Sequence, residues 1–273
     1  MIESLCDSFN QMHSLAAFSL EEESLGRVNT ASLPNQVLME LLLEKIENKR
    51  TLMGGEDEPK DLSQWSNVGL NDSSEVISIS WRYFGLMGEI NLRWIPPTIE
   101  SFEIGGNALC GSLDFRPLPP SIKYLLLNEN EFRGSIQLGH LPEGLEHVDL
   151  ATNDLTGSLD LKNLPSTLEI LYLSENRFSG EVCLTALPAA LKVLSLAVNE
   201  LTGPVDLTKL PPNIEKLFLY KNWIKGRTDF SKIPSSLKYL YLSKTYLSGD
   251  IYVAQDKFVT VYDSNVTIHR VEG

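Results

Sequence analysis

The most reactive side chains of this chain are its histidines and cysteines, which are scattered along its whole length. The histidines are His13, His140, His147 and His269. The cysteines are Cys6, Cys110 and Cys183. No histidine stands at a zinc-ligand or triad spacing from a Cys, Ser or Asp, and three scattered cysteines do not make a disulfide framework. We therefore expect no catalytic residue, no metal site and no cofactor, and we predict that the chain is not an enzyme.

Carboxylates recur at one position of a repeating pattern, which raises the question of cation binding. They are Asp114, Asp160, Asp206 and Asp229. A calcium or magnesium ion needs several converging oxygen ligands, and no second carboxylate stands at metal-ligand spacing from any of the four. We interpret this column as solvent-facing surface.

Aromatic side chains are unevenly distributed along the chain, and they are suited to binding a partner and not to catalysis. They gather in the segments KLFLYKNW (216–223) and YLYL (239–242). Tyr and Trp dominate the energetics of protein interfaces, and exposed apolar area marks contact sites. Equally, aromatic residues favour strands and stack on their neighbours without any partner. The predicted partner-binding residues are Tyr172, Phe218, Tyr220, Trp223, Tyr239 and Tyr241.

A period of 23 residues positions all of these side chains. Glycine recurs at this step as Gly88, Gly111, Gly134, Gly157, Gly180, Gly203, Gly226 and Gly249. Asparagine forms a second column of Asn107, Asn130, Asn153, Asn176, Asn199 and Asn222. A fixed period of this length is typical of a solenoid whose coils pack on their neighbours.

Each position of the repeat has a physical role. The alternation of Val148 and Leu150 predicts a short strand with its apolar side chains inward. The asparagine amide can donate to and accept from backbone groups of adjoining coils, so the column predicts a structural ladder. The glycine is needed either for a positive φ or because a Cβ would collide. Since a proline follows before two helical turns could form, the outer wall is predicted to be extended.

The pattern LxxLxLxxNxLxG occurs at Leu145 to Gly157, Leu168 to Gly180 and Leu191 to Gly203, and it resembles the leucine-rich repeat. Its continuation, GSLDLKNLP or GPVDLTKLP, resembles the 23-residue repeats of kinetoplastid and other protist proteins, a subclass related to plant-type repeats. The resemblance covers residues 76 to about 252. It implies a recognition module that binds a protein or peptide through the concave strand face.

A charged column borders the predicted strands and alternates in sign along much of its length. It consists of Glu100, Lys123, Glu146, Glu169, Lys192, Glu215 and Lys238. Neighbouring coils place these residues side by side as cross-strand pairs, each of which contributes a few tenths of a kcal/mol. We interpret the column as a solvated edge.

Both ends of a solenoid core need a cover. The segment from Ser32 to about Lys49 predicts a capping helix with Ser32 as N-cap and Pro34 in its first turn. Its apolar face is Leu38, Leu41, Leu42 and Ile46. A turn-rich connector at 52–74 is expected to pack Leu62 and Trp65 on the first coil.

The predicted fold is mainly β, a leucine-rich-repeat solenoid of about eight coils with an N-terminal α-helical cap. Residues 258–271 predict a shortened final coil closed by one more strand. The predicted domains are an unassigned arm (1–28), a helical cap and connector (29–75), the solenoid (76–252) and a C-terminal cap (253–273).

The net charge of −13 argues against a nucleic-acid surface, which needs clustered Lys and Arg. No apolar run is long enough for a membrane span, and the N-terminus lacks a secretory or mitochondrial signal. We therefore expect an intracellular, cytoplasmic assembly or scaffold subunit that binds a protein partner, within a larger complex or transiently. The alternative is a secreted or cell-surface recognition ectodomain, in which Asn71 and Asn265 would be glycosylation acceptors.

Overall fold

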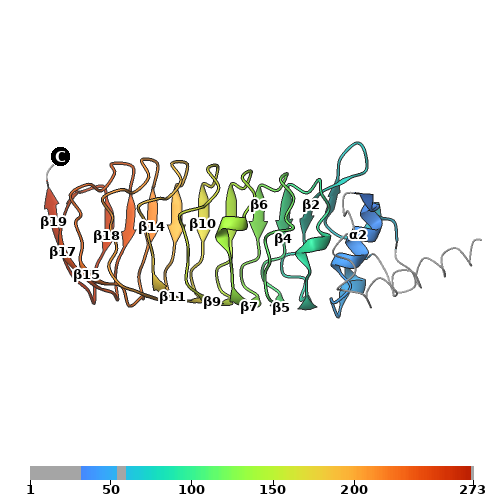
Figure 1. Ribbon diagram of the computed structural model, residues 1–273, viewed down its shortest axis with the longest axis horizontal. Coiled ribbons are helices and arrows are strands. Elements are labelled where there is room, and N and C mark those ends of the chain that lie inside the picture. Colours follow the sequence, from blue (N-terminus) through green and yellow to red (C-terminus); the bar gives the residue numbers. More distant parts are fainter. Residues whose placement is uncertain (1–31, 54–59, 272–273) are drawn as a thin grey trace, which may run out of the picture. The chain divides into compact units, whose positions relative to one another are not determined.

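The computed structural model describes residues 32–53 and 60–271. The described residues from 34 onward belong to one structural unit, whose coils stand side by side (Figure 1). The predicted arm at 1–28, with His13 and Cys6, lies outside the described residues.

A sheet that is parallel except for its first strand runs through this unit, because one apolar alternation recurs in every coil. Leu125, Val148 and Leu171 are fully buried at the inward position of successive strands. Leu125 pairs with Val148 and Val148 with Leu171, an offset of one repeat. The sheet consists, in order, of β1 (Val68–Leu70), β2 (Val76–Ser80), β4 (Ser101–Glu103), β6 (Tyr124–Leu126), β8 (His147–Asp149), β10 (Ile170–Tyr172), β12 (Val193–Ser195), β14 (Lys216–Phe218), β16 (Tyr239–Tyr241) and β18 (Phe258–Thr260).

The second wall of the coils is also extended. Its first sheet contains β3 (Met87–Glu89), β5 (Ala108–Gly111), β7 (Glu131–Ser135), β9 (Asp154–Gly157), β11 (Arg177–Glu181) and β13 (Glu200–Thr202). Its second sheet contains β15 (Lys225–Arg227), β17 (Tyr246–Ala254) and β19 (Asn265–Val271). Short 3₁₀ turns, η5 (Leu92–Trp94) and η6 (Leu138–His140), lie where two coils turn back. The predicted mainly β solenoid is confirmed, with coils from β2 to β18.

The asparagine column lies between the two walls and holds adjacent coils together. Asn130 donates through Nδ2 to the carbonyl oxygens of Ile104 (3.0 Å) and Leu127 (3.2 Å), and its Oδ1 accepts from the Leu109 N–H (3.1 Å). Ile104 and Leu109 belong to the preceding coil. Equivalent bonds are made by Asn107, Asn153, Asn176, Asn199 and Asn222.

The residue before each ladder asparagine has a left-handed backbone. Glu129 has a φ of 53° and Val198 a φ of 54°. Residues other than glycine seldom adopt this region, and β-branched residues such as Val198 adopt it least. This conformation directs each N–H to the next coil, where Glu129 donates to the carbonyl of Ala151 (2.8 Å) and Val198 to that of Tyr220 (2.9 Å). The inter-coil hydrogen bond offsets the cost of the backbone conformation.

The N-terminal helix is shorter than the sequence predicts. Helix α2 spans Asn35–Leu42, with Pro34 and not Ser32 at its N-cap position, and it buries Leu38, Met39 and Leu42. The chain leaves the helix there because residues 45–47 pair with the outer wall instead. The Glu47 N–H donates to the carbonyl of Met87 (3.0 Å), and Ile46 forms an antiparallel bridge with Gly88. The cap thus covers the free edge of β3.

The connector places its apolar residues on the first coil. It contains η3 (Lys49–Thr51), η4 (Leu62–Gln64) and strand β1, which pairs antiparallel with β2. Leu62 and Trp65 are buried, and the indole N–H of the buried Trp81 donates to the carbonyl of Ser66 (2.7 Å). The strand β1 was not predicted, because a three-residue edge strand leaves little pattern in a turn-rich segment.

At the other end the coil is shortened, as the sequence predicts. Strand β18 pairs with β16 in the main sheet, and β19 pairs with β17 along its whole length. Strand β17 crosses residue 252, where the predicted boundary between the solenoid and the C-terminal cap falls. In the coil before the shortened one, between β16 and β17, Thr245 replaces the ladder asparagine and donates to the carbonyl of Leu242 (2.7 Å).

Candidate interaction surface on the parallel sheet

Four positions of every coil project outward from the parallel sheet. In the β8 coil they are His147, Asp149, Ala151 and Thr152. In the other coils from β2 to β16 they are the residues at multiples of 23 from these four. We call this set of positions the sheet face. The repeat fixes its backbone, so the side chains there vary without affecting the core.

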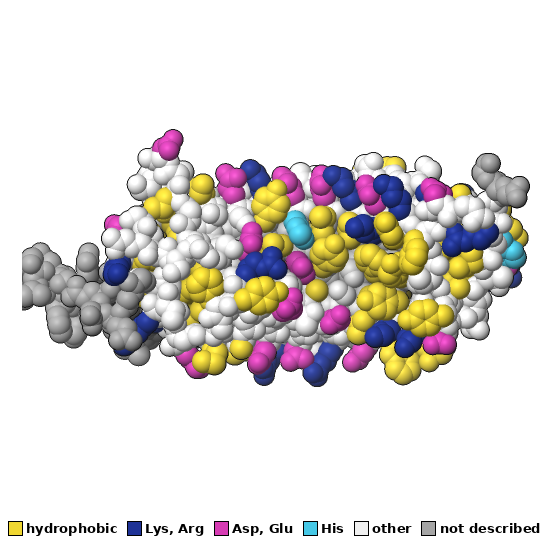
Figure 2. Space-filling view, turned by 180° about the vertical axis from the view of Figure 1, so that it is seen from behind, with side chains coloured by type: hydrophobic (Ala, Val, Ile, Leu, Met, Phe, Trp, Pro, Cys, Tyr) yellow, Lys and Arg dark blue, Asp and Glu magenta, His cyan; other side chains and the backbone are white. Residues whose placement is uncertain are grey.

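Four aromatic residues of the sheet face and one of the adjoining strand β18 form the aromatic cluster, which consists of Phe218, Tyr220, Tyr239, Tyr241 and Phe258. The Tyr241 ring lies 4.9 Å from Phe218, 5.6 Å from Phe258 and 6.3 Å from Tyr220 between centroids. Tyr239 and Phe258 are 39% and 52% exposed. Figure 2 shows hydrophobic side chains gathered on the C-terminal half of one face, with Lys and Arg side chains among them.

The structure separates the other two predicted binding residues from this cluster. Tyr172 contacts His147, with ring centroids 6.0 Å apart. Trp223 follows the ladder residue Asn222 and stacks on Tyr246 at 6.3 Å, 60% exposed. Sequence reasoning missed Phe258, because the final coil breaks the period: Phe258 stands opposite Tyr239, which precedes it by less than one repeat. The alternation in FVTVY was the signal that could have found it.

The charged column beside the sheet face forms ion pairs, as we expected. Lys123 lies 2.8 Å from Glu100, Lys192 lies 2.6 Å from Glu169, and Lys238 lies 3.4 Å from Glu215. Each pair joins neighbouring coils and is substantially exposed, so each adds little stability. The pairs neutralise one another at this edge.

Carboxylates occupy the sheet face from β4 to β10, and neutral donors hold them in place. Glu103 accepts from the hydroxyls of Ser80 (3.3 Å) and Ser101 (3.0 Å). Glu129 accepts from the Tyr83 hydroxyl (3.3 Å), and Glu175 from the Thr152 hydroxyl (3.4 Å).

Asp149 is the fourth carboxylate of this region and is partly buried. It accepts from the Ala151 N–H at 3.0 Å. Burial raises the pKa of Asp149, while this N–H and the charge of Arg82 act in the opposite direction. Among the described residues, none of the four carboxylates has a Lys or Arg nitrogen within ion-pair distance.

Lysines occupy the sheet face from β14 to β16. The Lys216 ammonium lies 5.6 Å from the centre of the Tyr239 ring, and the Lys244 ammonium lies 5.8 Å from the centre of the Tyr262 ring. Lys221 is exposed next to Tyr220. Within the described ranges these three lysines form no ion pair with a carboxylate. Cation–π contacts keep the charge of a lysine while holding it over an aromatic ring.

His147 lies on β8, within the carboxylate region, and is half-buried. Burial lowers its pKa, although the charge of Glu103 acts to raise it. Its Nε2 is buried without a hydrogen-bond partner in the described part of the chain. This histidine therefore favours the neutral form.

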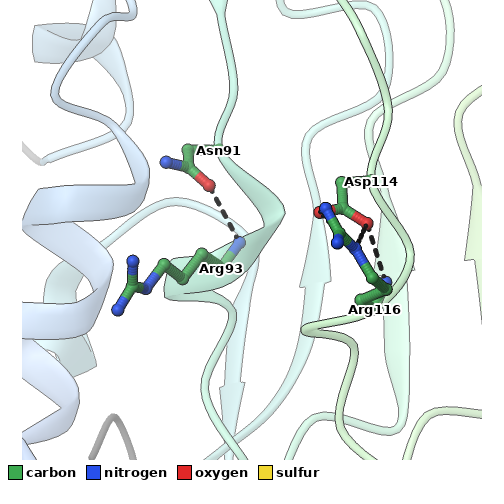
Figure 3. Close-up of polar contacts among 4 residues, drawn as sticks. All are labelled: Asn91, Arg93, Asp114 and Arg116. Atoms are coloured by element: carbon green, nitrogen blue, oxygen red, sulfur yellow. Dashed lines mark hydrogen bonds and ion pairs between the residues drawn. The ribbon is translucent and has the colours of Figure 1, made fainter. Parts of the chain in front are cut away.

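The aspartates of the outer wall have a structural role that the sequence did not reveal. Asp114 Oδ1 accepts from the N–H of Arg116 (3.1 Å) and from its Nε (2.9 Å), and Asn91 makes the same turn with the N–H of Arg93 (3.1 Å; Figure 3). Asp160, Asp206 and Asp229 each accept from the N–H two residues onward. Each side chain thus fixes the turn in the outer wall. The Arg116 side chain holds the pKa of Asp114 below its usual value.

The two described cysteines, Cys110 and Cys183, are free and half-buried, each in its own coil. In the described residues no helix is both long and apolar enough to cross a bilayer.

No protein-family model matches this sequence, and no curated protein matches it at a significant level. Solved structures do match. A plant ice-binding protein superposes with a TM-score of 0.59 at 21% identity, over 88% of both chains. The LRR ectodomain of the membrane receptor kinase GASSHO1/SCHENGEN3 from Arabidopsis thaliana superposes with a TM-score of 0.56 at 22% identity, over 86% of this chain and 33% of its own. The fold is that of a leucine-rich-repeat solenoid.

A TDR receptor shares the leucine-rich-repeat fold as well, with a TM-score of 0.55 at 24% identity, over 70% of this chain and 35% of its own. The present chain spans about a third of the length of these two receptor structures. Similarity at this level shows the fold alone. The assignment to a protist subclass of the repeat stays a prediction.

Proposed function

We propose that this protein is a non-enzymatic interaction module that binds a protein partner through its sheet face, as an assembly or scaffold subunit. The aromatic cluster carries the proposal, because partly exposed rings stand together on short strands whose backbones are fixed by the ladder. Rigid aromatic side chains lose little entropy on binding and dominate interface hot spots. The matched GASSHO1/SCHENGEN3 ectodomain was solved in complex with CASPARIAN STRIP INTEGRITY FACTOR 2, a precedent for binding by this fold.

The double variant Tyr220→Ala/Tyr241→Ala tests this function. It removes the centre of the aromatic cluster, and we expect it to weaken capture of the native partner by about tenfold or more. The matched control is Tyr246→Ala/Tyr252→Ala, which deletes two exposed tyrosines away from the sheet face (57% and 67% exposed). Partner capture would be quantified by mass spectrometry after confirming both folds by circular dichroism. Equal capture by both double variants would refute the proposal.

The ectodomain alternative is separated from the assembly subunit by glycan analysis. The Asn71 amide is engaged in its own turn, since its Oδ1 accepts from the N–H groups of Ser73 (3.0 Å) and Glu75 (2.9 Å). Asn265 is exposed at the start of β19. A glycan on Asn265 of the endogenous protein would favour the ectodomain.

A further inference from the structure

The sheet face divides into two regions of opposite charge. From β4 to β10 it carries the carboxylates of Glu103, Glu129, Asp149 and Glu175 and no Lys or Arg. From β14 to β16 it carries the ammonium groups of Lys216, Lys221 and Lys244 and no carboxylate. The coil of β12 lies between them, and its four positions hold Val193, Ser195, Ala197 and Val198, none of which is charged. The first three of these side chains are buried.

Within the described residues these carboxylates and lysines form no ion pair on the sheet face, although the charge of Arg82 in the β2 coil acts on Asp149. The ion pairs at the edge column show that this fold readily pairs charges in neighbouring coils, as in Lys192 with Glu169. On the sheet face, in contrast, hydroxyl and amide groups hold the carboxylates, and tyrosine rings hold Lys216 and Lys244. Both sets are therefore positioned but remain available to a partner of opposite charge.

We propose that the sheet face binds one extended segment of a partner protein that is basic at one end, and acidic and apolar at the other. The inference rests on the proposed function and specifies its ligand. The basic end lies over Glu103, Glu129 and Asp149, and the acidic end lies over Lys216 and Lys244, with its apolar side chains on the aromatic cluster.

The length of the segment follows from the strand spacing. Strands β4 to β16 are separated by six steps of ~4.8 Å, or about 29 Å, which an extended chain covers with about nine residues at ~3.3 Å each. Electrostatic matching of this kind selects the orientation and the identity of a partner more than it adds raw affinity.

Selection of peptides on the intact chain tests the proposal without knowledge of the native partner. A phage library of random 12-residue peptides would be panned against the wild-type protein. We expect enriched peptides with Lys or Arg in one half, and with Asp or Glu beside aromatic or aliphatic residues in the other. Panning on Lys216→Glu/Lys244→Glu should abolish the acidic preference. Lys123→Glu/Lys192→Glu, which makes the same charge change at the edge column, should leave it intact.

A second measurement uses only the wild-type protein, so that variant folding cannot obscure the result. An enriched peptide would be synthesised together with an isomer in which its basic and acidic residues exchange places while its apolar residues stay. Reversing the direction of the isomer on the face cannot restore the match. We expect it to bind about tenfold more weakly at low salt, with a smaller difference at high salt where the charges are screened.

The outcomes distinguish the two proposals. Two results would overturn the proposal of a segment with opposite charges at its ends but leave the proposed function standing. One is that enriched peptides require Tyr220 and Tyr241 but show no order of charges. The other is that the isomer binds with equal affinity. The absence of any enriched peptide that requires these tyrosines would overturn both.

Discussion

A ladder asparagine satisfies backbone groups in two coils at once. Asn153 donates to the carbonyls of Leu127 (3.1 Å) and Leu150 (3.2 Å) and accepts from the N–H of Phe132 (3.0 Å). An unpaired buried polar group costs ~1–3 kcal/mol. The stability of the solenoid therefore depends strongly on single residues of this column.

Asn153→Ala leaves several buried backbone groups without partners. We expect it to lower the free energy of unfolding by about 3 kcal/mol or more. Asn163→Ala, at an exposed position in a turn of the same coil, should change it by less than about 0.5 kcal/mol. Chemical denaturation followed by circular dichroism measures both. Similar values for the two variants would contradict the role of the ladder.

His147 links stability to pH at the residue scale. Because burial lowers its folded pKa, the unfolded chain takes up a proton first as the pH falls below about 6.5. This proton uptake favours unfolding. The titration of His147 therefore leaves the free energy of unfolding unchanged above that pH and lowers it below that pH.

We therefore expect the wild type to lose more stability between pH 7.5 and pH 5.5 than His147→Gln does. The control His140→Gln, at an exposed position in η6, should lose as much as the wild type. Denaturation curves at the two pH values provide the comparison, and equal losses in wild type and His147→Gln would argue against this linkage.

At the scale of elements, the N-terminal cap and the edge of β3 are joined by one close backbone contact. A Cβ at Gly88 would stand 2.2 Å from the carbonyl oxygen of Lys45, whereas a Cβ at Gly111 would meet nothing closer than 3.4 Å. Both glycines have a positive φ, of 106° and 95°. An alanine would thus be strained at both positions, but of the two it would collide with a backbone oxygen only at Gly88.

Gly88→Ala should for this reason displace the cap, while Gly111→Ala should produce only the strain. We expect faster amide hydrogen exchange in residues 35–47 of Gly88→Ala, and unchanged exchange there in Gly111→Ala. Hydrogen exchange with mass spectrometry resolves this segment. Unchanged protection of the cap in Gly88→Ala would show that it does not depend on this contact.

At the scale of the whole solenoid, the coils are interchangeable in backbone and distinct in surface. Each pairs with its neighbours at the same offset, from β2 with β4 to β14 with β16. A deletion of one complete period should therefore rejoin equivalent positions, whereas a deletion one residue shorter reverses the inward and outward alternation.

Removal of residues 149–171 joins Val148 to Tyr172 and keeps the pattern, and removal of 149–170 joins Val148 to Leu171 and breaks it. We expect the first deletion to unfold cooperatively near the wild-type midpoint, and the second to lose its cooperative transition. Thermal melts of the two proteins give the answer. Equal melts would show that the period is not essential to stacking.

The sequence alone predicted the elements that repeat, because each depends on local pattern. Alternating leucines, the asparagine column and the early proline each indicate the same coil. The helix was predicted too long, since residues 45–47 pair with β3, a partner distant in the chain. Strand β1 and the position of Phe258 were also missed, because both depend on pairing with another segment and not on the period.

By itself, then, the sequence determined the solenoid, its period and the columns that face outward. Because the coils have equal length and stack on one another, residues one period apart in the chain lie side by side in the structure. Only the tertiary structure decided which outward side chains meet. It joined Phe258 to Tyr241, separated Trp223 and Tyr172 from the aromatic cluster, and placed Lys216 over Tyr239 instead of beside a carboxylate. These contacts depend on distances between side chains in different coils, and a one-dimensional pattern does not contain them.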